Sequence, residues 1–181
     1  MPIEGIIMDA FVLKNILDLH SKWLKGEDGG VRADLHSANL QSANLRSANL
    51  RFANLQNAYL QSAYLQSANL QFANLQFADL RSAKFNSATK WPAPTMVLLA
   101  NWGEVSDTLC LALMRFDCAN HPDGPKRFDE WVKTGRCPYD NVNVARSANF
   151  QEKKRLWNEG LALHAFPLMT MVLSEKCVKE D

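Results

Sequence analysis

The chain has 181 residues, of which 47% are hydrophobic and 22% charged, a composition typical of a folded globular protein rather than of a disordered chain or a fibre. Its formal net charge is +1, so it has no strong overall field to collect nucleic acid, an anionic membrane or a basic partner. No apolar stretch approaches the ~20 residues of a membrane-spanning helix. The first residues also lack the basic segment of a secretory signal, and we expect a cytoplasmic protein.

The N-terminal segment predicts one helix. Its apolar residues follow helical spacing from a capping aspartate, Asp9, and three glycines then end the pattern. The spaced residues are Leu13, Ile16, Leu17, His20 and Leu24, and the glycines are Gly26, Gly29 and Gly30. We therefore expect a cap helix over residues 9–25, within an N-terminal unit of residues 1–30, on which His20 and Trp23 pack without a ligand role.

A repeat of period five follows. Alanine recurs at every fifth position from Ala33 to Ala88, twelve times in succession, and an apolar residue stands two positions after nearly every alanine. This second set comprises Leu35, Leu40, Leu45, Leu50, Leu55, Leu60, Leu65, Leu70, Leu75, Leu80 and Phe85, with Lys90 at the same position of the degenerate last pentad. We expect the eleven apolar residues to form the core of the repeat.

Period five matches neither regular element of secondary structure. In a helix, leucines five apart would spread over the whole surface, and in a flat strand an odd period would send successive leucines to opposite faces. Each pentad must therefore contain its own corner. If each corner turns the chain by about a quarter circle, four pentads close a coil of 20 residues with alanine and leucine pointing inward.

The motif A-[ND]-L-x-x over residues 33–92 closely resembles the pentapeptide-repeat family. The resemblance implies a right-handed quadrilateral β-helix, here of about three coils, in a domain of residues 31–92. The expected fold class is thus a mainly β solenoid with an N-terminal cap helix and a mostly α-helical C-terminal unit. On this register Lys90 would stack on Leu50 and Leu70.

Residues 93–181 lack the repeat and predict a mostly helical domain. Helical patterns lie near residues 106–119, 126–134, 151–158 and 167–178. All four cysteines lie here, and we expect reduced thiols. Three of them with one histidine, namely Cys110, Cys118, His121 and Cys137, offer four soft ligands, but their spacing is not that of a paired zinc knuckle. We expect no metal, no cofactor and no catalytic residues.

Five outward aromatic residues interrupt the repetitive Asn, Gln and Ser surface of the repeat, and we expect them to form a partner-binding surface: Phe52, Phe72, Phe77, Tyr59 and Tyr64. A soluble monomer rarely leaves such surface bare. Either the N-terminal helix or the C-terminal unit covers it, or a second copy or an unidentified protein partner does. We do not expect nucleic acid or membrane as a partner.

The predicted function is a non-enzymatic protein–protein interaction scaffold. One alternative is a metal-binding C-terminal module carried on the repeat. Another comes from the family resemblance, because some members act on DNA gyrase, a topoisomerase, by imitating DNA with an acidic surface. Residues 33–92 carry a net charge of +3, however, and an imitation of phosphate needs the opposite sign.

Overall fold

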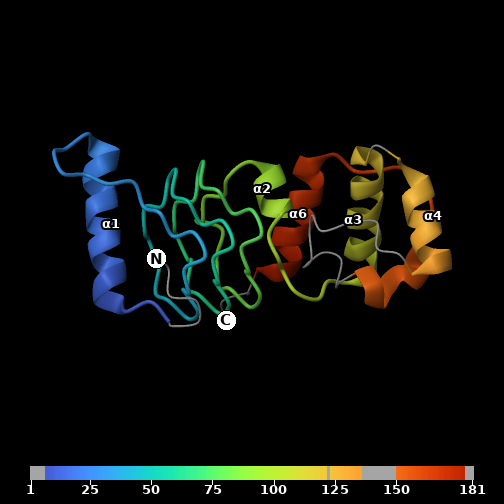
Figure 1. The fold of residues 1–181 in the computed structure, drawn as a ribbon, viewed down its shortest axis with the longest axis horizontal. Helices are drawn as coiled ribbons and strands as arrows, with labels where there is room; N and C mark the ends of the chain where they lie inside the picture. The colour runs from blue at the N-terminus through green and yellow to red at the C-terminus, as the bar shows by residue number, and fades with distance from the viewer. Residues whose placement is uncertain (1–6, 122, 136–149, 178–181) are drawn as a thin grey trace. The chain divides into compact units, whose positions relative to one another are not determined.

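The computed structural model describes residues 7–121, 123–135 and 150–177. It divides into two compact units: unit 1 extends to Trp102 and includes Lys176 and Cys177, and unit 2 is Gly103–Glu175. The helices are α1 (Ala10–Lys25), α2 (Pro94–Leu98), α3 (Asp107–Asn120), α4 (Pro125–Thr134), the 3-10 helix η1 (Lys154–Leu156) and α6 (Ala165–Lys176) (Figure 1). Within the described ranges, no helix has both the length and the apolarity that crossing a membrane requires.

The repeat winds into coils of 20 residues. Parallel β-bridges join residues one coil apart, as in the column of Asp34, Asn54 and Asn74. The Leu35 amide donates to the Asn54 carbonyl (2.7 Å), and the Asn54 amide donates to the Ala33 carbonyl (3.0 Å). The bridges are isolated, and the described residues contain no longer strand. Four pentads to a coil is the predicted arrangement, and each straight side is only long enough for a single bridge.

Each pentad contains a tight corner. The Ala38 amide donates to the Leu35 carbonyl (3.1 Å), which closes a β-turn, and the third turn residue, Ser37, has φ 54°. The same position is left-handed at ten successive corners, with φ from 54° to 62°. The Asn39 side-chain oxygen accepts from the Gln41 amide (3.2 Å) and so holds the next corner. Asparagine and serine therefore recur because the turn needs them.

The core of unit 1 lies inside the coils. The eleven residues Leu35 to Phe85 are exposed by no more than 3%, and most of the alanines beside them are buried as well. Burying each leucine contributes about 1.5–3 kcal/mol, so the leucine columns supply much of the stability of unit 1.

The last pentad departs from the predicted register. Lys90 does not occupy the leucine position, because one extra residue enters the corner before it. Thr89 takes the alanine position and is 7% exposed, whereas Lys90 bridges Asn69 from the outward position. The Asn86 side-chain oxygen accepts from the Ser67 amide (3.0 Å), where the equivalent corner one coil earlier uses a backbone carbonyl. The stacking of Lys90 on Leu50 and Leu70 was therefore wrong, and Trp91 follows in that column.

The coil continues beyond the recognised repeat. After α2, the triplet Ala100-Asn101-Trp102 returns to the stack, with Asn101 bridging Asp79. The Leu80 amide donates to the Asn101 carbonyl (2.7 Å), and the Asn101 amide donates to the Ala78 carbonyl (2.8 Å). Trp102 therefore lies at a leucine position and is 7% exposed. This triplet carries unit 1 past the boundary at 92–93 that the repeat pattern alone indicates.

Helix α1 packs on the first coil. The Asp9 carboxylate accepts from the Phe11 amide (2.8 Å), and Gly26 ends the helix at φ 72°. His20 is fully buried, and its Nδ1 accepts from the Ala33 amide (3.1 Å). Gly30 lies so close to the Trp23 backbone that a Cβ there would be 2.3 Å from the Trp23 nitrogen.

Unit 2 is helical and packs around an aromatic cluster of Phe128, Trp131, Phe150 and Trp157, whose ring centroids lie 4.5 to 6.4 Å apart. Helices α3, α4 and α6 lie within two residues of the predicted ranges. The predicted helix at 151–158 is shorter: residues 150–153 are helical, η1 follows, and residues 157–164 have no regular secondary structure.

Candidate interaction surface

The most exposed aromatic pair of unit 1 is a stack of Phe52 and Phe72. These residues lie one coil apart at the same corner, with ring centroids 4.9 Å apart and planes inclined by 10°. Phe52 is 39% and Phe72 is 64% exposed. We call this pair the aromatic ridge.

The ridge residues occupy an unfavourable backbone conformation. Phe52 has φ 62° and Phe72 has φ 61°, at the corner position where the repeat otherwise mostly has serine. Bulky residues rarely adopt left-handed backbone, which costs them about 1–2 kcal/mol. The fold needs no large side chain at this position, since the Ser37 and Ser42 corners have the same geometry without one.

Two further side chains border the ridge. The Arg51 guanidinium lies 5.2 Å from the Phe52 ring centroid and 5.9 Å from that of Phe72, within cation–π range. The Trp23 ring of α1 meets Phe52 edge to face at 6.2 Å and stacks on His20 at 5.6 Å. Helix α1 thus contacts one end of the ridge, while Trp23 itself stays 38% exposed. The sequence placed Trp23 only as a packing residue of α1.

The other predicted surface residues lie elsewhere on the coil. Phe77 is half-buried at the next corner, and Tyr59 is 45% exposed on a bridge column with Asn39. Tyr64 lies between two cations, with the Arg46 guanidinium 4.0 Å and the Lys84 ammonium 4.6 Å from its ring centroid. Within the described ranges, no ring contact joins these three residues to the ridge.

The imidazole of His20 is buried and stacks on Trp23, the residue that borders the ridge. Burial lowers its pKa, the Arg51 backbone opposes that shift, and the Arg32 charge adds to it. Its Nε2 is buried without a hydrogen-bond partner in the described part of the chain. His20 is therefore neutral at neutral pH, with its lone pair on Nδ1 used by the Ala33 amide.

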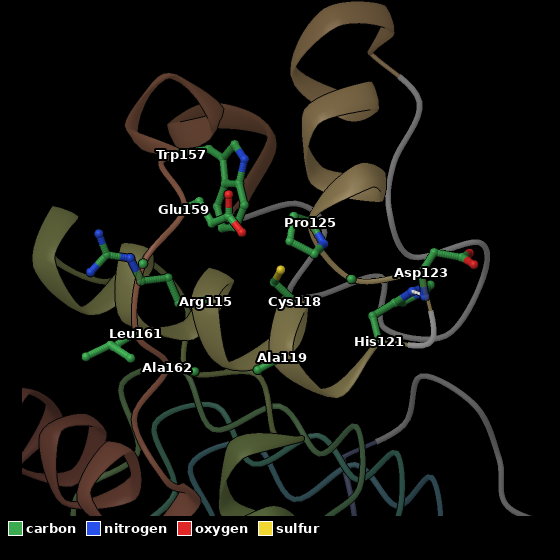
Figure 2. A pocket seen from close by; sticks show the side chains of 12 residues that line it. Arg115, Cys118, Ala119, His121, Asp123, Pro125, Trp157, Glu159, Leu161 and Ala162 are labelled. Carbon is green, nitrogen blue, oxygen red and sulfur yellow. Dashed lines mark hydrogen bonds between the residues drawn. The ribbon is translucent and has the colours of Figure 1, made fainter.

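Unit 2 contains an open groove of about 460 Å³ between α3, the start of α4 and residues 157–162. Figure 2 shows Arg115 and Leu161 at one end, His121 and Asp123 at the other, and Cys118 between them. The Arg115 guanidinium donates to the Asn158 side chain and lies within 3 Å of where a Cβ on Gly160 would stand. Arg115 thus holds the loop rather than a ligand.

In the described part of unit 2, the side chains of Cys110, Cys118 and His121 are not arranged for nucleophilic chemistry. Burial raises the pKa of Cys118, and it raises the pKa of Cys110 to about 11, so both are thiols at neutral pH. His121 Nδ1 accepts from the Asp123 amide (3.2 Å). Cys137 lies outside the described residues. Across the described ranges, no three His, Cys, Asp or Glu side chains meet in a group able to hold a metal ion.

The family match to known proteins lies within the repeat. The pentapeptide-repeat family profile matches residues 31–66 and 48–86, in eight copies. A pentapeptide repeat protein of the cyanobacterium Cyanothece 51142, named Rfr23, is 43% identical over 32% of this chain and 40% of its own length, with a TM-score of 0.32. A pentapeptide repeat protein of the Arabidopsis thaliana thylakoid lumen is 21% identical over 69% of this chain and 72% of its own, with a TM-score of 0.37.

No curated protein matched the chain. Pentapeptide repeat proteins form right-handed quadrilateral β-helices, and the 20-residue coil of unit 1 is the arrangement that four five-residue sides require. The extra corner residue before Lys90 and the returning triplet at Trp102 are departures of this chain from the regular repeat. Residues 31–86, which form most of the coils of unit 1, therefore belong to the pentapeptide repeat protein family.

Proposed function

We propose that the chain is a non-enzymatic protein-binding module and that the aromatic ridge of Phe52 and Phe72 is its contact surface. The observation that supports this most strongly is the exposure of a stacked aromatic pair on left-handed backbone. A residue that is costly for the fold and exposed to water contributes little to stability. Its presence at two successive coils is better explained by a contact with another protein.

The chemistry of the ridge fits a protein partner. Stacked rings offer a rigid apolar surface at low entropic cost, and aromatic and arginine side chains are enriched at the centres of protein interfaces. The Arg51 guanidinium lies against both rings and can donate hydrogen bonds to a carboxylate of the partner. We therefore expect a partner with an apolar patch beside an acidic residue.

Affinity capture from a lysate of the native source tests the proposal. Phe72→Ser introduces the residue that other corners already carry, so the coil should fold while the ridge loses its more exposed ring. We expect the variant to lose at least about tenfold in affinity for the main retained protein, the loss typical of a central interface aromatic.

Phe77→Ser is the matched control, because it makes the same chemical change at the same pentad position one corner away, where no ridge forms. It should retain the partner. Equal retention by the wild type and by the folded Phe72→Ser variant would remove the ridge as the contact surface.

A further inference from the structure

The charged side chains of the coil are unevenly distributed over its four sides. The first and second sides, residues 33–42, 53–62 and 73–82, carry two acids and one cation: Asp34, Asp79 and Arg81. The third and fourth sides, residues 43–52, 63–72 and 83–92, carry four cations and no acid. The positive charge of the repeat is therefore concentrated on two adjacent sides. We call these four cations the basic face: Arg46, Arg51, Lys84 and Lys90.

Tyr64 holds two cations of the basic face. It lies in the middle coil of the third side, and Lys84 bridges it from the next coil. The Arg46 guanidinium lies 4.0 Å and the Lys84 ammonium 4.6 Å from its ring centroid. The ring attracts both cations, but it is no counter-ion, and the two positive charges repel each other. An anion placed beside them would relieve this repulsion.

The cations of the basic face have no carboxylate partner among the described residues. Arg46 and Lys90 are exposed, and Lys84 is half-buried. The Arg51 Nε is buried and has no hydrogen-bond partner within the described ranges. Arg81 on the second side differs, because its guanidinium pairs with the Asp79 carboxylate at 2.6 Å. The charge of the basic face is therefore available to a ligand, whereas that of Arg81 is neutralised by the coil itself.

The fold does not need these cations. Another coil carries a neutral amide side chain at each of the four positions: Gln66 for Arg46, Gln71 for Arg51, Asn44 for Lys84, and Asn69 for Lys90. The corners after Arg46 and Gln66 have the same geometry, with φ 56° at Ser47 and 59° at Ser67. Grouped like charges oppose the compact state through their repulsion. Their grouping beside the aromatic ridge is better explained by a partner of opposite charge.

We propose that the basic face binds an acidic segment of the protein partner, next to the apolar residue that contacts the ridge. The proposal rests on the proposed protein-binding function and adds the chemistry of the partner. Arg51 joins the two surfaces, since its guanidinium lies against both rings of the ridge. Arginine and lysine form strong, charge-assisted hydrogen bonds with carboxylates, and the planar arginine can bind both oxygens.

The size of the basic face fits a short segment. The first and third coils are about 10 Å apart, two rises of ~4.8 Å, which an extended peptide spans with about three residues of ~3.3 Å each. A short run of aspartate and glutamate therefore reaches all three coils. A nucleic acid would extend most of its phosphates beyond these four cations, so it fits the face less well.

Fluorescence anisotropy with the full chain tests the proposal. The probe is a labelled peptide of about twelve residues in which pairs of glutamates alternate with single leucines. We expect the wild type to bind it with a Kd below about 100 µM at ~50 mM salt, and at least about tenfold more weakly at ~500 mM salt. Arg46→Gln, Lys84→Asn and Lys90→Asn together should weaken binding by about tenfold or more. This variant should fold, because each change introduces a residue that the same position carries in another coil.

Arg81→Gln is the matched control for Arg46→Gln. Both variants make the same chemical change at the same pentad position, and Gln61 and Gln66 already occupy these positions in the middle coil. Arg46→Gln should weaken peptide binding by about threefold, because it removes an unpaired cation of the basic face. Arg81→Gln should change it by less than about twofold, because Asp79 already neutralises that charge.

A wild type that does not bind the peptide at concentrations up to ~1 mM would overturn the proposal. Equal affinities of Arg46→Gln and Arg81→Gln would do the same, and so would tighter binding of an oligothymidylate with the net charge of the peptide. Affinity capture separates the two proposals. Full retention of the captured partner by the threefold variant, with its loss in Phe72→Ser, would contradict the acidic segment alone. Retention by Phe72→Ser, with loss in the threefold variant, would contradict the ridge.

Discussion

Replacing Phe72 by glycine distinguishes a recognition residue from a structural one. Phe72 is 64% exposed, so only about a third of its side chain is buried, contributing ~0.5–1 kcal/mol. Its stack on Phe52 adds about 0.5–1.5 kcal/mol. Glycine relieves about 1–2 kcal/mol of cost, because the backbone at Phe72 is left-handed with φ 61°. The terms nearly cancel, and we expect the opening free energy of the coil to change by less than about 1 kcal/mol.

Leu70→Ala provides the contrast two residues away. Leu70 is fully buried in its column, so truncation should cost about 3–5 kcal/mol, through lost transfer free energy and the cavity left behind. Both changes shorten an apolar side chain within the same coil; they differ in the burial of that side chain and in the left-handed backbone that glycine relieves at position 72.

Hydrogen exchange measured by mass spectrometry on peptides from residues 33–92 is the appropriate assay. It reports the opening of unit 1 separately from that of unit 2, which a single unfolding curve for two units would not do. A loss of protection above about 3 kcal/mol in Phe72→Gly would refute the argument, since it would show that Phe72 holds the coil together.

Two predictions concern the attachment of α1 to the first coil. Gly30→Ala should detach the helix, because the added Cβ would lie 2.3 Å from the Trp23 backbone nitrogen. We expect the hydrogen-exchange protection of residues 10–25 to fall while the middle coil stays protected. Unchanged protection of α1 would show that the loop relaxes to accommodate the methyl group. Burial lowers the pKa of His20 below 6.5, so its contribution to stability is present above pH 6.5 and is lost as the pH falls through the folded-state pKa. The hydrogen-exchange protection of α1, corrected for intrinsic exchange, should therefore weaken between pH 7 and pH 5 in the wild type. It should not weaken in His20→Asn, which keeps an acceptor for the Ala33 amide. Equal pH dependence in both proteins would exclude His20 as the cause.

The regular part of unit 1 could be predicted from sequence because every pentad has the same local structure, a short side followed by a corner. Alanine and leucine point inward, asparagine holds the turn, and the following serine takes the left-handed position. A period of five excludes helix and flat strand on geometry alone. The coil length of 20 residues then follows from four corners to a turn.

The prediction from sequence was wrong where one extra residue changes the register of the coil. The extra residue before Thr89 leaves the five-residue alanine spacing intact at Ala88. The sequence pattern therefore continues to Ala88, although the register of the coil has already shifted by one residue. Thr89 is accepted inside because its hydroxyl donates to the Leu65 carbonyl (2.9 Å). The triplet Ala100-Asn101-Trp102 has the Ala-Asn pair of the repeat motif, but α2 separates it from the other pentads.

The candidate surface was only partly predictable. Repeat spacing places Phe52 and Phe72 one coil apart, so their stacking follows from the sequence. The approach of Trp23 depends on how α1 crosses the first coil, which no periodicity reports. Tyr64 looked equally suited to an interface, yet its ring is used by Arg46 and Lys84 on the adjacent coils.

Photo-crosslinking in cells of the native source tests the central claim most directly. Benzoylphenylalanine at position 72 keeps an aromatic ring on the ridge, and the same residue at position 77 reports on the half-buried corner beside it. We expect a discrete crosslinked protein from position 72 and none from position 77. No crosslink from position 72, or the same product from both positions, would contradict it.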